Sequence, residues 1–138
     1  MQEIYVTLGK LDSKACTDYV TYSGAGGVVV FVGTVRDQTK GKTVKHLEFE
    51  SYEPMAIKEM QRISDLAIEK WGLHKMVIHH RVGLVPITEE AVVIACSSAH
   101  RKEAFAACEY AIDTLKKTVP IWKKEIFEDG EVWVSAHP

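Results

Sequence analysis

A nearly continuous apolar run at residues 28–35 places the strongest constraint on how this chain can fold. It follows a glycine-rich segment and is far shorter than the ~20 apolar residues that a helix needs to cross a bilayer. An apolar run of this length without polar alternation is typical of a strand that is covered on both faces. We therefore expect a sheet with packed layers on each side of this strand.

The rest of the sequence alternates between strand and helix patterns. Further strands are expected at residues 4–8, 45–52, 76–82 and 91–97, with a turn containing Pro86 at residues 83–90. Helices are expected from Asp12 and Ser13 to Tyr22, from Pro54 to Trp71, and from a start near His100 and an N-cap at Ser98 to Pro120. Asp129-Gly130 predicts a C-terminal hairpin between strands at residues 124–127 and 131–134. The sequence thus predicts an α+β fold, residues 1–138 forming a single domain with a mainly antiparallel or mixed sheet, two long helices and a C-terminal hairpin.

Charge and cysteine content exclude several classes of protein. A net charge of -2 gives no overall basic field for nucleic acid, so a bound anion must be held by a local group of cations. The three cysteines, Cys16, Cys96 and Cys108, are odd in number and widely spaced, which favours free buried thiols over disulfides or a zinc site. The first residues lack a signal-peptide pattern and no run could span a membrane, so we expect a cytoplasmic protein.

Two glycine- or histidine-rich features carry little chemistry by themselves. The segment Gly24-Ala25-Gly26-Gly27 precedes a strand instead of opening a helix, so a turn is favoured over a phosphate-binding loop. His79 and His80 are adjacent on an expected strand and point to opposite faces, so they do not form a metal pair and structural or surface roles are favoured.

Two segments offer cations for an anionic ligand. His100 and Arg101 begin an expected helix, where free backbone N–H groups favour an anion, although both can equally be solvated residues of a first turn. Lys116 closes the same helix, and the reversal at Pro120 can bring Lys123 back toward it. Two close lysines can serve as acid, base or nucleophile, whereas a solvated basic patch is the alternative. Arg36, where the apolar strand enters a loop after Gly33, is a further candidate.

These pieces together resemble the large, catalytic subunit of molybdopterin synthase. The matching segments occur in family order at residues 30–36, 47–52, 79–83, 97–101 and 115–125, and include Ser97-Ser98-Ala99-His100-Arg101 and Pro120-Ile121-Trp122-Lys123-Lys124-Glu125. The resemblance implies an α/β-hammerhead fold and a homodimer within a heterotetramer. It also implies a small ubiquitin-like sulfur-carrier partner whose C-terminal Gly-Gly thiocarboxylate converts cyclic pyranopterin monophosphate to the dithiolene of molybdopterin.

The resemblance also implies roles for individual residues. Lys116 and Lys123 match catalytic lysines, and the remaining substrate-binding positions are Thr34, Val35, Arg36, His100, Arg101, Lys124 and Glu125, with no metal and no cofactor. Thr34 stands where other members can carry a lysine, and His137 where some place an arginine contributed across the dimer. Two readings stay open beside this one: a non-catalytic docking module for a ubiquitin-like tail, and a generic phosphate-ligand enzyme.

Overall fold

The computed structural model describes residues 2–134 and contains a first, four-stranded sheet in the order β1-β5-β7-β2. Its strands are β1 (Gln2–Thr7), β5 (Lys75–Arg81), β7 (Glu90–Ser98) and β2 (Gly27–Thr34). β1 pairs with β5 in parallel, whereas β5–β7 and β7–β2 are antiparallel, so the sheet is mixed.

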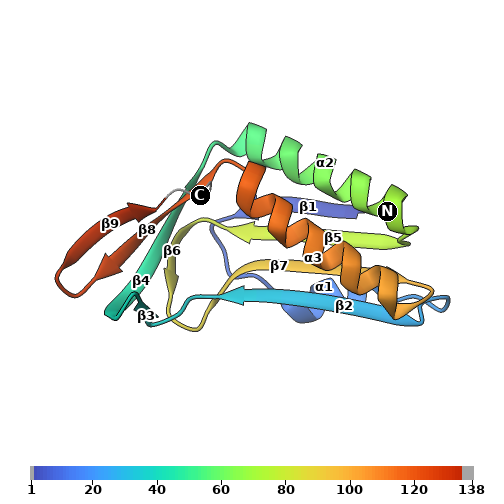
Figure 1. Cartoon of the computed structure of the whole chain (residues 1–138), viewed down its shortest axis with the longest axis horizontal. Coiled ribbons are helices and arrows are strands. Elements are labelled where there is room, and N and C mark those ends of the chain that lie inside the picture. Colours follow the sequence, from blue (N-terminus) through green and yellow to red (C-terminus); the bar gives the residue numbers. More distant parts are fainter. Residues whose placement is uncertain (1, 135–138) are drawn as a thin grey trace.

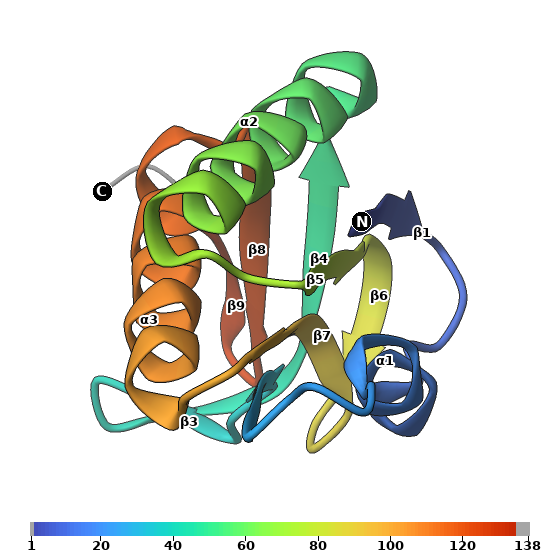
Figure 2. The same cartoon turned by 90° about the vertical axis from the view of Figure 1, so that its right-hand side faces the viewer.

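Helices cover both faces of this sheet. α2 (Glu53–Trp71) and α3 (Arg101–Thr118) lie on one face, and the short α1 (Ser13–Val20) lies on the other (Figure 2). The strand residues alternate accordingly: Ile78 belongs to the core under α2 and α3, and Val77 to the smaller core under α1. Because successive strand residues point to opposite faces, the next pair, His79 and His80, is divided between the same two layers.

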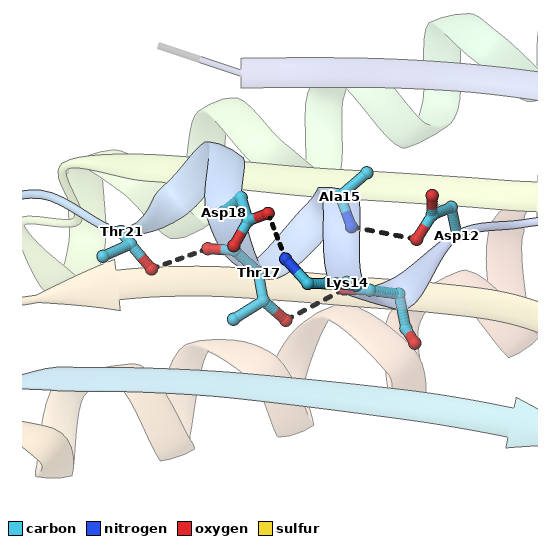
Figure 3. A network of polar contacts seen from close by, with 7 residues as sticks. Asp12, Lys14, Ala15, Thr17, Asp18 and Thr21 are labelled. Atoms are coloured by element: carbon cyan, nitrogen blue, oxygen red, sulfur yellow. Dashed lines mark hydrogen bonds and ion pairs between the residues drawn. The ribbon is translucent and has the colours of Figure 1, made fainter.

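The short helix α1 is held by local polar contacts, which are drawn in Figure 3. The side chain of Asp12 accepts a hydrogen bond of 3.0 Å from the backbone N–H of Ala15, which caps the helix as the sequence predicts. Lys14 and Asp18 form an ion pair of 3.0 Å along the exposed side of the helix. These contacts leave Cys16 and Val20 as the buried face toward the sheet.

A second sheet stands at one end of the first (Figure 1, left). It consists of β3 (Gln38–Thr39), β4 (Lys42–Ser51), β8 (Ile121–Phe127) and β9 (Gly130–Val134) in that order, and β6 (Gly83–Pro86) pairs with β4. Gly130 has a φ of 145° in the β8–β9 hairpin, a conformation that glycine adopts without steric cost. The predicted α+β class, mixed sheet, two long helices and C-terminal hairpin are confirmed.

Three local predictions were wrong. β2 is an edge strand, not one buried on both faces, and Val28 and Phe31 are 38% and 36% exposed. The expected turn at residues 83–90 contains strand β6, because Gly83 at a φ of 84° redirects the chain to pair with β4. The N-cap of α3 is His100, not Ser98, whose hydroxyl instead donates to the carbonyl of His100.

The predictions for the cysteines and for membrane-spanning helices can also be compared with the structure. Cys16, Cys96 and Cys108 are free and buried, as predicted. Within residues 2–134, the helices are all too short or too polar to cross a bilayer. His137 lies outside the described residues.

Candidate functional site

A cavity of about 300 Å³ lies where the two sheets meet the C-terminal part of α3. Most of its lining is apolar, and two lysines and one histidine provide its charged or ionisable groups. The lining residues are Phe31, Gly33, Thr34, Leu47, Phe49, His80, Ala91, Val92, Ile112, Leu115, Lys116, Ile121 and Lys123. Lys116 and Lys123 therefore line one cavity, although they come from a helix and a strand.

The chain reversal after α3 brings these two lysines together. α3 ends at Thr118, because Val119 precedes a proline and is extended, with φ and ψ of -81° and 126°. The chain then enters β8, where the N–H of Ile121 donates to the carbonyl of Val119 at 2.8 Å. In β8, Lys123 stands directly opposite Phe49 of β4, and paired residues share a face of the sheet. Both lysines thus reach the cavity from adjoining elements.

The loop after β2 forms a hollow beside the cavity. This hollow, of about 640 Å³, is lined by residues 34–41 together with Ile87 and Thr88, so that Thr34 belongs to both spaces. Val35 is buried, its N–H donates to Glu89 at 3.2 Å and its carbonyl accepts from Thr88 at 2.9 Å. Val35 therefore fixes the loop, while Arg36 is exposed in this hollow, which shares Thr34 with the lysine cavity.

His100 and Arg101 lie elsewhere, at the N-terminal end of α3. They line a separate hollow of about 620 Å³ together with Gly26, Ala99, Lys102 and Phe105. Arg101 and Lys116 stand at opposite ends of α3, about 22 Å apart at 1.5 Å per residue. The substrate-binding positions that the resemblance implies therefore do not converge on a single hollow within one copy of the chain.

The two residues after Lys123 point in different directions. Glu125 is on the same face of β8 as Lys123 and opposite Leu47, and it is only 6% exposed. Lys124 alternates to the other face of the strand, opposite Glu48. Glu125 thus lies on the face of β8 that carries Lys123 without lining the cavity itself, whereas the side chain of Lys124 is on the far side of the sheet.

His80 is a cavity residue that the sequence reasoning missed. It is 5% exposed, its Nδ1 lies 2.8 Å from the carbonyl oxygen of Arg81, and its ring meets the Phe49 ring edge-on at 5.2 Å. Burial lowers the pKa of His80 to about 4, so the ring is neutral at pH 7. Alternation along the strand correctly separated His80 from His79, but only the topology shows which face borders a cavity.

The opposite histidine, His79, belongs to a buried polar network under α1. Its Nδ1 lies 3.3 Å from the Cys16 sulfur, and its Nε2 lies 2.9 Å from a carboxylate oxygen of Glu3. Burial lowers the pKa of His79, and the Glu3 carboxylate opposes that shift. Desolvation raises the pKa of the Cys16 thiol to about 11, so this cysteine is a protonated structural group and not a nucleophile.

The described part of the chain contains no cluster of side chains suited to binding a metal ion. Among these residues, no group of three or more histidine, cysteine, aspartate or glutamate side chains is arranged to hold an ion. Desolvation also raises the pKa of Cys96 to about 12 and that of Cys108 to about 11, which leaves them without thiolate character.

Comparisons with known proteins point to one family. A relative from Bacillus subtilis, described as a molybdopterin synthase catalytic subunit, is 46% identical over 134 residues, covering 97% of this chain and 85% of the relative. A protein of the same description from Staphylococcus carnosus is also 46% identical over 134 residues, covering 97% of this chain and 89% of the relative.

A solved structure shares the fold over nearly the whole chain. The crystal structure of molybdopterin synthase from Staphylococcus aureus superposes with a TM-score of 0.90 at 44% identity, covering 95% of this chain and 96% of that chain. The family model described as MoaE protein matches residues 6–118, which include both ends of β2 and the whole of α3. On these matches, the chain belongs to the MoaE protein family.

Proposed function

We propose that this chain is the catalytic subunit of a molybdopterin synthase. It transfers sulfur from the C-terminal thiocarboxylate of a small ubiquitin-like partner to cyclic pyranopterin monophosphate, and so forms the dithiolene of molybdopterin. The observation that carries the proposal is the pair Lys116 and Lys123 on one mainly apolar cavity. The descriptions of its relatives as catalytic subunits of this synthase support the same activity.

The chemistry of the cavity fits two anionic reactants. Ammonium groups attract a thiocarboxylate or phosphate more strongly in an apolar enclosure than in water, because the local dielectric is lower. The narrow cavity suits the extended end of a Gly-Gly tail, which has no side chains. We assign Lys123 as the acid and base for proton transfers at the pterin side chain, and Lys116 as its partner and charge stabiliser. Thr34 lines this cavity, Arg36 lines the hollow that shares Thr34 with it, and Glu125 is on the same face of β8 as Lys123.

A second copy of the chain supplies the remaining cations. Arg101 is about 22 Å from Lys116 along α3 and His100 precedes it, so these two residues can serve a lysine cavity only from another protomer. The edge strand β2 exposes Val28 and Phe31, and Phe105 of α3 is 61% exposed in the same hollow as His100 and Arg101. Exposed apolar side chains at a sheet edge favour association between chains. We propose a homodimer, with one sulfur-carrier subunit for each protomer, acting in the cytoplasm without a metal or cofactor of its own.

Single-turnover sulfur transfer tests the proposed function. Lys116→Ala and Lys123→Ala are each expected to lower the rate of dithiolene formation by about 100-fold or more, because acid–base groups contribute roughly that much. Lys117→Ala is the matched control, since Lys117 lies on the same helical turn but does not line the cavity. Near-normal rates in both lysine variants would remove the basis of the proposal.

The same assay separates the two other readings. A docking module would bind the thiocarboxylated partner but produce no dithiolene at any enzyme concentration. A generic phosphate-ligand enzyme would bind nucleotides or phosphosugars tightly and would not require a protein sulfur donor.

A further inference from the structure

The lysine cavity contains a buried hydrogen-bond acceptor, His80, whose role is distinct from those of the two lysines. Among the described side chains that line the cavity, nine are glycine or apolar and two are lysines, which in their ammonium form can only donate. Thr34 and His80 are thus the two lining side chains able to accept a hydrogen bond. Thr34 is exposed at the mouth, whereas His80 is 5% exposed.

The backbone fixes which nitrogen of His80 carries the proton. A carbonyl oxygen can only accept, so the 2.8 Å contact between Nδ1 and the carbonyl of Arg81 requires the proton to be on Nδ1. In the neutral ring, Nε2 then carries a lone pair and no proton. The Phe49 ring meets the imidazole edge-on at 5.2 Å, and Val92, the register partner of His80 on β7, lines the same cavity. The acceptor is therefore preorganised before any ligand arrives.

We propose that Nε2 of His80 accepts a hydrogen bond from an N–H group of the bound ligand and so positions that ligand for the transfer of the thiocarboxylate sulfur to the pterin side chain. This inference rests on the proposed function and adds a positioning residue to it. A ligand N–H that enters the apolar cavity loses its water, and it must find an acceptor to avoid a large desolvation cost. Two sources can supply this group: a backbone amide of the Gly-Gly tail, or a ring N–H of the pterin.

Nitrogen NMR of the full-length protein tests the acceptor directly. With ¹⁵N-labelled histidine at pH 7, His80 is expected to show a protonated Nδ1 and a bare Nε2. A synthetic peptide ending in Gly-Gly is added in one arm and cyclic pyranopterin monophosphate in the other, and the arm that shifts the Nε2 signal identifies the source. A protonated Nε2, or no shift in either arm, would overturn the proposal.

Variants provide a second readout that a purely structural role would not produce. His80→Leu removes the acceptor and is expected to raise the KM for the ligand identified by NMR about 10-fold, with a smaller change in kcat, whereas His80→Gln restores most of the affinity. His79→Leu is the matched control, because His79 is also buried but lies under α1 on the opposite face. Equal KM values for wild type and His80→Leu, or equal KM increases in His80→Leu and His79→Leu, would contradict the positioning role.

Failure of this inference can be distinguished from failure of the proposed function. If the lysine variants lose activity while His80→Leu has the wild-type KM, the sulfurtransferase function is supported and the acceptor role of His80 is refuted. If the wild-type protein forms no dithiolene but Nε2 still responds to the peptide, the acceptor role is supported and the proposed sulfurtransferase function is refuted.

Discussion

Replacing His80 with leucine should change how the stability of this protein depends on pH. Burial lowers the pKa of His80 to about 4 in the folded protein, below the ~6.5 of an unfolded histidine. Between these values the unfolded chain binds more protons than the folded one, so the stability from a neutral His80 is present above pH 6.5 and is lost as the pH falls toward 4. The expected loss is about 2 kcal/mol at pH 5 and about 3 kcal/mol at pH 4.

Urea unfolding at fixed protein concentration, followed by tryptophan fluorescence, measures this effect. The free energy of unfolding of wild type relative to His80→Leu should fall by about 2 kcal/mol between pH 7 and pH 5. The comparison with the variant removes the contribution of His79, whose pKa is also lowered by burial. Ile78→Val is the control: it lies two residues earlier on the same face of β5 and has no titrating group, so its stability difference from wild type should be the same at both pH values. A pH-independent difference between wild type and His80→Leu would refute the reasoning.

Two other predictions test the packing. Gly27→Ala should destabilise the protein by about 1–3 kcal/mol in thermal unfolding, because a Cβ there would lie 2.6 Å from the backbone Cα of Arg101. Gly9→Ala, whose Cβ would meet only the Thr7 hydroxyl at 3.6 Å, should leave the melting temperature nearly unchanged, and equal effects would contradict this account. The three buried thiols should react with a thiol-specific reagent only on the timescale of unfolding at neutral pH, and rapid labelling of the native protein would show that burial does not protect them.

Local signals allowed much of the fold to be predicted from the sequence. Gly72 ends α2 in the left-handed conformation, with a φ of 63°, and Pro120 stops α3 just after Val119. Asp129-Gly130 marks the β8–β9 hairpin. Each signal acts through the backbone of a few neighbouring residues and does not depend on the rest of the fold.

Features that depend on contacts between segments far apart in the sequence could not be predicted from such local signals. The apolar composition of β2 suggested burial on both faces, but strand order makes it an edge. Its exposed Val28 and Phe31 are explained if a partner covers that edge. Similarly, the cavity beside His80 arises only where β4 and β8 of the second sheet meet the first, and no local pattern records that junction.

The candidate site was predicted in part for the same reason. Lys116 and Lys123 are joined by a short reversal, and the sequence indicated that they could approach each other; both line one cavity. His100 and Arg101 are separated from them by the length of α3, a rigid spacer. We therefore proposed that the basic residues of the sequence belong to a site built from two copies of the chain.

Activity of mixed dimers tests this composite site most directly. Arg101→Ala and Lys123→Ala proteins, each nearly inactive alone, should regain about a quarter of the wild-type activity after subunit exchange, because half of the dimers then contain one intact site of two. A mixture of Lys116→Ala with Lys123→Ala should regain none, since both lysines line the same cavity of one chain. No recovery in the first mixture after verified exchange, or equal recovery in both, would contradict a site shared between two copies.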